Sequence, residues 1–353
     1  MRMIKPGFEI YDIPDATDHD AVLMHLEKIG RTCYKSEDMI TTDSASKFLQ
    51  NIRNRKHWAM LEHYIFVVSI PEWMYDNIKH LIVEACYNED SEFILKSSFL
   101  HITEWNDCNN QKYNYLASFS ATTLNYLIAC DLVNDGLGNP IAQLFQFMKN
   151  RYPELMMDPN GIIRECDSSI EFLSRDEIKS LPNWLREIHD FMSVKFTVDR
   201  GVTHEIVRHR PASYAQESTR YCNYSKGKFG NEITVITPSF FAKEDNDAVD
   251  NLMFDMWKHS CEVAEREYFD LLQFGATPQQ ARSVLPNSLK ADIVMTATLH
   301  EYRHFFDMRC DPPAHPQMKE VTCPFLREAN SNTYYEHMFD DKMYMANNDK
   351  EVK

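Results

Sequence analysis

SVKFTVDRGVTHEIVRHRPASYAQESTRY, residues 193–221, begins with a strand-like run and ends in a cationic segment rich in hydroxyl groups. The run SVKFTV (193–198) is β-branched and aromatic, which is typical of a strand. HEIVRHR (204–210) has helical spacing, and Pro211 is expected to end that helix. Three arginines and a histidine within residues 208–221 stand out in a chain of net charge −16 and indicate an anionic ligand.

Strand and helix patterns alternate outward from this stretch, which predicts an α/β (α+β) fold. Strands are expected at 63–70, 231–238 and 291–299. Helices are expected at 18–34 with a stop at Gly30, 44–54, 247–274 closed by Gly275, 278–285 after a Thr277 cap, and 300–309. Three helical patterns, at 74–87, 122–133 and 140–152, and the turn cluster NDGLGNP (134–140) characterise the middle of the chain. The expected organisation is a discontinuous core of residues 1–71 and 193–325, a helical insertion at 72–192, and a loosely held polar tail at 326–353.

The composition excludes several classes of protein. With 353 residues, 44% hydrophobic and 25% charged, the chain has the balance of an ordinary globular protein. Its acidity argues against a general nucleic-acid or anionic-membrane binder. Nine cysteines without a Cys-x-x-Cys pair predict reduced thiols in a cytoplasm. No apolar run approaches the length of a membrane span, so we expect a cytoplasmic protein with neither nucleic-acid nor membrane partners.

One motif suggests a metal. HEYRH, residues 300–304, matches the zinc-protease pattern in which His300 and His304 share a helix face and Glu301 acts as base. Glu320 lies where a third ligand could come from. An amphipathic helix that carries two histidines by chance is the favoured explanation, because five-residue patterns recur by accident. The histidines of HEIVRH (204–209) are five positions apart and point in different directions on a helix.

Residues 213–220 form a candidate phosphate-binding site. Ser213-x-x-Gln216 has the spacing of a capping box, which predicts a helix N-terminus with free amides near QES. Arg220 adds a guanidinium group that can bind phosphate through two parallel hydrogen bonds. A solvated basic turn is the alternative interpretation. Ser218 could instead be a nucleophile, although the sequence supplies no positioned base for it. The chain has no P-loop, and GLGNP is a poor match to a dinucleotide-binding turn.

Several of these sequence features occur together in one known family. Arg208-His209-Arg210, seven residues and then Ser218 resemble the R-H-R-x7-S signature of the flavin-dependent thymidylate synthases. HWAMLEH (57–63) is similar to the first block of that family, residues 199–225 to its central block, and residues 281–318 to its third. The resemblance implies a sheet flanked by helices, assembled as a homotetramer with shared active sites. It also implies FAD as cofactor, NADPH as reductant and methylenetetrahydrofolate as donor for converting dUMP to dTMP.

The resemblance also implies roles for individual residues. The expected FAD-binding residues are Arg208, His209, Arg210, Gln216, Thr298, His300 and His304, with His57, Ala59 and Glu62 on the flavin and folate side. The expected dUMP-binding residues are Glu205, Arg208, Gln216, Glu217, Ser218, Arg220, Arg282 and Arg309. Arg309 and Ser218 are expected at the reaction itself, Arg309 stabilising negative charge on the uracil and Ser218 donating a hydrogen bond. No metal is expected.

The match has departures. Thr298 replaces the family's usual Asn, His300 its Arg, Tyr302 its Trp and Glu205 the Gln of many members, while Trp58 and Ala59 break the first block. These changes put the details of flavin and nucleotide binding in question. The alternatives are a methylase of a related nucleotide such as UMP, a nucleotide-binding relative without activity, and a zinc hydrolase built on His300, Glu301 and His304.

Overall fold

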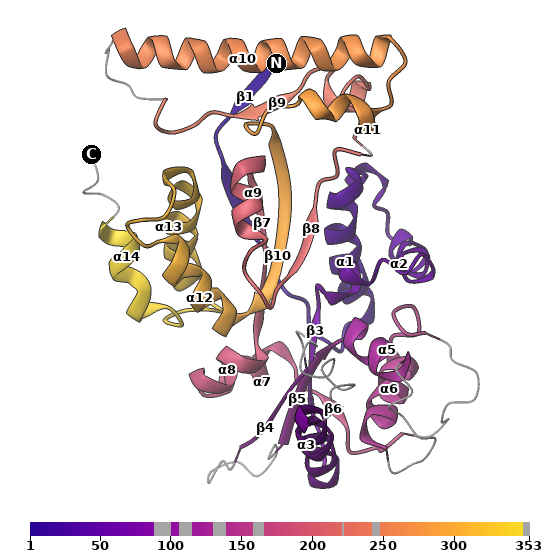
Figure 1. Ribbon diagram of the computed structural model, residues 1–353. Helices are drawn as coiled ribbons and strands as arrows, with labels where there is room; N and C mark the ends of the chain where they lie inside the picture. The colour runs from indigo at the N-terminus through magenta and orange to yellow at the C-terminus, as the bar shows by residue number, and fades with distance from the viewer. Residues whose placement is uncertain are drawn as a thin grey trace.

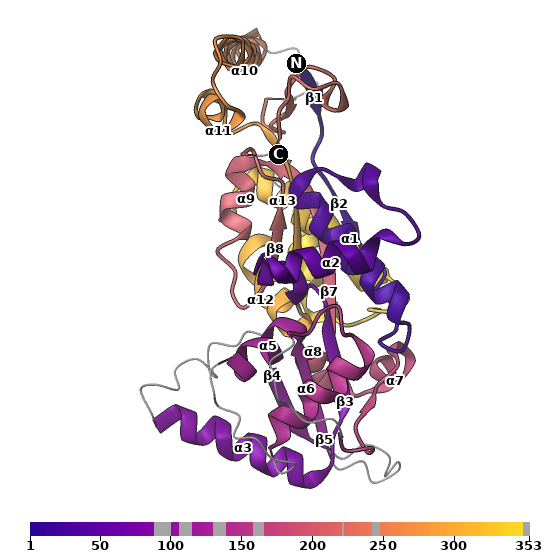
Figure 2. The ribbon, with the colours of Figure 1, turned by 90° about the vertical axis from the view of Figure 1, so that its right-hand side faces the viewer.

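The computed structural model describes residues 1–87, 100–105, 115–129, 139–157, 166–220, 222–241 and 248–348. The predicted turn at 134–138, the end of the predicted helix at 130–133, Tyr221 and the last five residues lie outside these ranges. The fold is mixed α/β, with antiparallel sheets flanked by helices as expected (Figure 1). Helices flank the central sheet on both sides (Figure 2).

The strands of the described residues form three sheets. The central sheet has the antiparallel order β2 (Gly7–Ile10), β7 (Phe191–Asp199), β10 (Lys290–Thr298) and β8 (Ser213–Gln216). The second sheet has the antiparallel order β4 (Leu100–Glu104), β5 (Tyr115–Ser120), β3 (Ile65–Ser69) and β6 (Glu171–Phe172). A short parallel pair joins β1 (Arg2–Ile4) to β9 (Thr234–Ile236).

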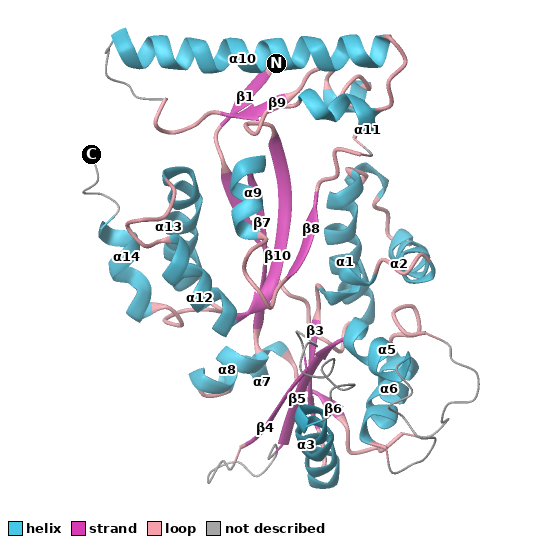
Figure 3. Cartoon of the chain, in the orientation of Figure 1, coloured by secondary structure: helices cyan, strands magenta, loops and turns pink. Residues whose placement is uncertain are grey.

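Figure 3 shows how the helices surround these sheets. The α-helices are α1 (His19–Tyr34), α2 (Ser44–Asn54), α3 (Glu72–Tyr87), α5 (Ala121–Ala129), α6 (Pro140–Arg151), α7 (Arg175–Ser180), α8 (Asn183–His189), α9 (Arg200–Ile206), α10 (Ala248–Gln273), α11 (Pro278–Ala281), α12 (Leu299–Arg309), α13 (Pro316–Ser331) and α14 (Met343–Asn348). The 3-10 turns are η1 (Glu37–Met39), η2 (Trp58–Glu62), η4 (Gly227–Phe229), η5 (Arg282–Val284) and η6 (Asp340–Lys342).

Strand β10 separates two hydrophobic cores because its side chains alternate between the faces of the sheet. Ile293 and Met295 belong to the core that also holds residues of α9, α12 and α13. Val294 faces the other core, which holds residues of α1, η2 and the second sheet. The nine-residue antiparallel pairing of β10 with β7 runs from Lys290 opposite Asp199 to Thr298 opposite Phe191. A rigid central pair therefore carries helices on both of its faces.

Two local predictions near the site are wrong. Helix α1 does not stop at Gly30 but continues to Tyr34, and Lys35 follows it with φ of 48°. A Cβ on Gly30 would lie 2.8 Å from the Phe48 ring, so this glycine permits close packing of α2. Helix α9 covers residues 200–206 rather than 204–210, capped by Asp199, whose carboxylate accepts from the Val202 amide at 2.7 Å. Residues 208–210 therefore lie beyond the helix.

The middle and the end of the chain also differ from expectation. Residues 72–192 contain strands β4, β5 and β6 besides helices, and β3, expected in the core, pairs with β5 and β6. The tail is not loosely held over its described part, because Leu326 lies inside α13 and Tyr335 and Phe339 are buried. The Phe339 ring packs 5.1 Å from Phe306 of α12. Aromatic residues thus anchor a segment whose overall composition is polar.

Candidate functional site

A cavity of about 340 Å³, here called the arginine-lined cavity, lies at the end of β8. Its walls come from the C-terminal end of α1, the residue before η2, the start of α9, β8 with the loop that follows, and η5. The lining residues are Cys33, Tyr34, His57, Arg200, Tyr214, Gln216, Glu217, Ser218, Thr219, Arg220 and Arg282. Three arginines in one small cavity favour a ligand with a phosphate group.

The backbone after β8 is fixed from two sides. The Glu217 amide donates to the Asp292 carbonyl of β10 at 2.8 Å, and the Ser218 amide donates to the Cys33 carbonyl of α1 at 3.1 Å. The Ser218 hydroxyl accepts from the Arg220 amide at 3.4 Å. Ser218 is therefore held at the junction of α1 and the central sheet.

The predicted capping box at residues 213–216 is wrong, because these residues form β8. The Ser213 hydroxyl donates to the Glu62 carboxylate, and the Gln216 amide group donates to the Thr203 hydroxyl at 2.9 Å. A Ser-x-x-Gln spacing is a local pattern, and the ladder to β10 overrides it. The basic side chains, rather than helix-end amides, supply the positive charge of the cavity.

Arg282 and Glu217 differ in exposure and in whether an opposite charge of the protein pairs with them. The Arg282 guanidinium donates to the Thr219 hydroxyl at 3.3 Å, and the residue is exposed. The Glu217 carboxylate is only 3% exposed and accepts from Lys290 at 2.9 Å. Glu217 lines the cavity, but its charge is already paired within the protein.

A second cluster joins α9 to the end of α12. The Arg309 guanidinium donates through Nε to His209 Nε2 at 2.7 Å, through Nη1 to the Glu205 carboxylate at 2.7 Å, and through Nη2 to the Glu205 carbonyl at 3.0 Å. Arginine has five N–H donors, so these three bonds leave two for a ligand. The side chain of Arg309 is 15% exposed. Arg309 does not line the arginine-lined cavity.

His209 is neutral in this cluster. Burial, with Arg309 and His304 nearby, lowers the pKa of His209 to about 4. A neutral imidazole can accept the hydrogen bond from Arg309 at Nε2, and its Nδ1 then carries a hydrogen. That Nδ1 atom is buried without a protein partner. The ring lies 4.8 Å from Phe305 and 5.8 Å from His304.

A larger cavity of about 570 Å³, here called the junction cavity, lies between the start of α12 and the second sheet. Thr298 and His300 contribute one wall together with Pro211, which follows the Arg208–Arg210 segment. Thr298 caps α12, accepting from the Glu301 amide at 3.4 Å. The opposite wall comes from the inserted residues, including Lys79 and His101. His101 Nε2 is buried without a protein partner.

The other predicted residues lie on several elements, and of these His57 also lines the arginine-lined cavity. Burial raises the pKa of Glu62 despite its hydrogen bond from Ser213. His57 is exposed and shares a 2.7 Å hydrogen bond with the Tyr34 hydroxyl, whereas Ala59 is exposed on η2. Arg208, Arg210 and His304 are exposed. A single copy of the chain thus gathers six predicted residues in the arginine-lined cavity: His57, Gln216, Glu217, Ser218, Arg220 and Arg282.

Sequence reasoning missed several residues of this cavity. They are Cys33, Tyr34, Arg200, Tyr214 and Thr219. Arg200 lies two positions after the strand pattern of residues 193–198, where α9 begins, and this position could have been singled out. Within the described ranges, no group of three or more His, Cys, Asp or Glu residues is placed to hold a metal ion. Among the same residues, no helix is both long and apolar enough to cross a bilayer.

Comparison with known proteins finds a family that matches this part of the chain. The family described as thymidylate synthase complementing protein matches residues 181–332, which contain α9, β8, η5, β10 and α12. The resemblance to the flavin-dependent thymidylate synthases is therefore confirmed over this region. Cys33, Tyr34 and His57, which complete the arginine-lined cavity, lie outside the matched range.

Two relatives illustrate the extent of the similarity. The chain is 30% identical over 168 residues to the flavin-dependent thymidylate synthase of Pyrococcus abyssi, covering 45% of this chain and 66% of the relative. It is 32% identical over 130 residues to that of Geobacter sulfurreducens, covering 37% and 52%. The chain thus covers less than two thirds of either relative. A crystal structure of the UMP/dUMP methylase PolB from Streptomyces cacaoi, bound with 5-Br UMP, is 20% identical, covering 48% of this chain and 83% of PolB with a TM-score of 0.38.

Proposed function

We propose that the protein is a flavin-dependent thymidylate synthase. It converts dUMP to dTMP with methylenetetrahydrofolate as carbon donor, FAD as cofactor and NADPH as reductant. The observation that carries this proposal is the arginine-lined cavity, most of whose lining lies in the region that matches the family. The relatives quoted above carry the same function in their names.

The nucleotide binds in the arginine-lined cavity in this proposal. Arg200, Arg220 and Arg282 hold its phosphate, because guanidinium groups form paired, charge-assisted hydrogen bonds with phosphate oxygens. Ser218 supplies a further hydrogen bond from its fixed position between α1 and β10. Flavin chemistry requires no enzyme nucleophile, so Ser218 acts by binding.

Arg309 stabilises negative charge on the uracil ring. Its hydrogen bonds to Glu205 and His209 fix the guanidinium before substrate arrives, which is the arrangement that makes electrostatic stabilisation effective. Because Arg309 lies outside the cavity of its own chain, we propose a homotetramer in which neighbouring copies complete each site. The proposed division of the chain is a core of residues 1–71 and 193–325 with an insertion at 72–192. A cytoplasmic location is also proposed, and the free cysteines among the described residues fit it.

The residues present fit a flavin. His209 Nδ1 and His101 Nε2 are buried polar atoms without protein partners, as expected of groups that bond to a cofactor. Thr298 and His300 lie at the junction cavity, while exposed Arg208 and Arg210 can hold the cofactor's phosphates. When bound, FAD supplies the electrons that reduce the transferred one-carbon group to a methyl group. The protein's part is to bind and orient it.

The decisive experiment is a turnover assay on purified protein. Protein that is yellow and forms dTMP from dUMP, methylenetetrahydrofolate and NADPH supports the proposal. UMP is included as a competitor, and preferential methylation of UMP would establish the related nucleotide methylase instead. Colourless protein with stoichiometric zinc and no dTMP formation would refute flavin chemistry.

A further inference from the structure

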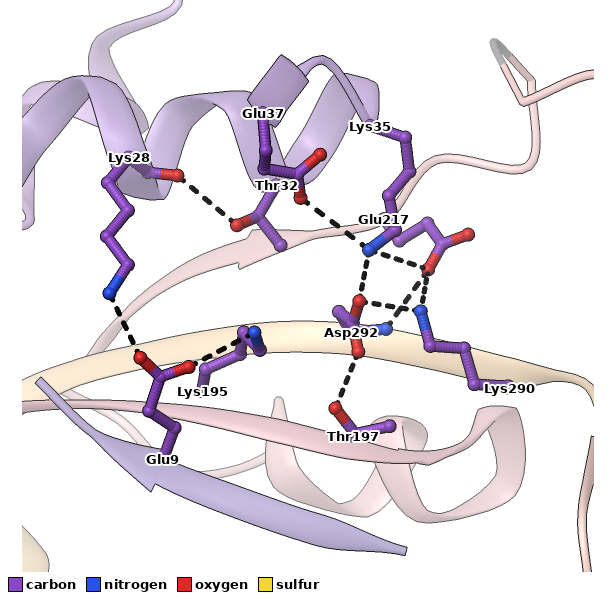
Figure 4. A network of polar contacts seen from close by, with 10 residues as sticks. All are labelled: Glu9, Lys28, Thr32, Lys35, Glu37, Lys195, Thr197, Glu217, Lys290 and Asp292. Carbon is purple, nitrogen blue, oxygen red and sulfur yellow. Dashed lines mark hydrogen bonds and ion pairs between the residues drawn. The ribbon is translucent and has the colours of Figure 1, made fainter. Parts of the chain in front are cut away.

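Four charged side chains form a closed network behind the arginine-lined cavity (Figure 4). Lys35 follows α1, Glu217 follows β8, and Lys290 and Asp292 lie on the same face of β10, two positions apart. All four are largely buried, with side chains between 3% and 18% exposed. We call them the Lys35 network.

The contacts in this network are short and reciprocal. Lys290 Nζ lies 2.9 Å from the Glu217 carboxylate and 2.6 Å from that of Asp292. Lys35 forms an ion pair with Asp292 and lies 3.7 Å from Glu217. The Asp292 carboxylate also accepts from the Thr197 hydroxyl at 2.7 Å, and its amide donates to Glu217 at 3.3 Å. The network therefore joins β7, β10, β8 and α1 at one point.

The charges within the network balance. Two lysines face two carboxylates, and the carboxylate of Glu37, which is 41% exposed, lies 3.6 Å from Lys35 at the edge. Of the four residues, only Glu217 lines the arginine-lined cavity. Without the lysines, its carboxylate would be a buried negative charge beside a site that must accept an anion. Such a charge would repel a phosphate dianion. It would also attract the arginine side chains of the cavity and so compete with the phosphate for them.

We propose that Lys35 and Lys290 are positioning residues that make the arginine-lined cavity selective for ligands carrying phosphate, by neutralising Glu217 and Asp292. Lys35 acts from outside the cavity and through Glu217. The backbone bond from Ser218 to Cys33 ties the same end of α1 to the cavity wall, so the network also fixes the position of Ser218. This inference rests on the proposed nucleotide site, and it adds that phosphate selectivity depends on side chains that touch no substrate.

The test measures binding of dUMP, deoxyuridine and inorganic phosphate by calorimetry in Lys35→Met, Lys35→Arg and the double variant Lys35→Met/Glu217→Gln. Lys35→Met is expected to weaken binding of dUMP and phosphate about tenfold, as one uncompensated charge nearby would, and to leave deoxyuridine binding nearly unchanged. Lys35→Arg and the double variant, in which the charges balance again, should recover most of the phosphate affinity. Equal weakening of dUMP and deoxyuridine, or no recovery in the double variant, would overturn the proposal.

Lys28→Met is the matched control. Lys28 lies on α1, the helix that Lys35 follows, and pairs with Glu9 at 3.0 Å (Figure 4). It does not line the arginine-lined cavity. Its removal should leave phosphate binding unchanged. If Lys35→Met fails to fold, Glu217→Gln alone keeps the shape of the side chain and leaves one positive charge in excess. Phosphate binding should then tighten, and an unchanged or weaker affinity refutes the inference.

The inference and the proposed function can fail separately. Selective phosphate binding that follows these charge changes, in a protein that forms no dTMP, would retain the network's role and reject the enzyme activity. Normal dTMP formation together with a phosphate affinity that does not change in Lys35→Met would support the enzyme activity and reject the network's role.

Discussion

Arg309→Met is the substitution with the clearest expected consequence. It removes three hydrogen bonds at once and leaves the partly buried Glu205 carboxylate and His209 Nε2 without their donor. Breaking a buried ion pair by removing one partner costs about 3–5 kcal/mol, and we expect the lower end because Glu205 is 31% exposed. The pKa of His209 should rise, because the neighbouring guanidinium is one of the causes that lower it.

Catalysis should suffer as well as folding. Loss of a fixed donor to developing negative charge lowers kcat by about a hundredfold or more, while nucleotide binding through Arg220 and Arg282 is retained. The assays are urea unfolding, dTMP formation and dUMP binding. Arg303→Met on the same helix is the control, since Arg303 pairs with Asp341 and Glu187 away from the cavity. Unchanged turnover in Arg309→Met would refute the assigned role.

Three further predictions concern binding and pH. Ser218→Ala should keep measurable dTMP formation with a raised KM for dUMP, and complete loss of turnover with intact dUMP binding would point to a covalent mechanism. Arg282→Met should weaken dUMP binding about tenfold or more, as expected for a lost hydrogen bond to a charged group. The midpoint of unfolding should change little, because the side chain is exposed. Equal affinity for dUMP would contradict the role of Arg282 in binding phosphate. Burial lowers the pKa values of His63 and His189 from 6.5 to about 3, so the unfolded state binds more protons below pH 6.5. The free energy of unfolding should therefore fall as the pH drops from 6.5 towards 3, and a flat profile in urea titrations would exclude this linkage.

Patterns of apolar residues and capping residues predicted the helices and strands whose formation depends on their own sequence. Strands β7 and β10 and helices α10 and α12 lie where their residue patterns indicated, because long apolar or periodic runs leave few alternatives. Capping chemistry was equally informative at Thr277 and Pro278, which open α11 with a complete capping box. Of these elements, β10 and α12 lie within the third block of the family resemblance.

Contacts between distant segments were beyond prediction. β3 was expected as a strand, but its partner β5 lies within residues 72–192, which showed only helical patterns. Residues 213–216 carry a helix-capping pattern, yet their backbone bonds come from β10, almost eighty positions later. The Lys35 network gave no sequence pattern for the same reason, since α1, β8 and β10 meet only in the folded chain.

The composite wall of the arginine-lined cavity has a consequence for proteolysis. Its lining comes from five separate stretches of chain, from Cys33 to Arg282, so no fragment that separates α1 from β8 retains the whole site. A ligand that binds there stabilises the closed arrangement by mass action. Saturating nucleotide should therefore slow cleavage of the loop between α1 and α2, although that loop lies outside the cavity. Resistance to a protease would thus report occupancy of the proposed nucleotide site without a measurement of activity.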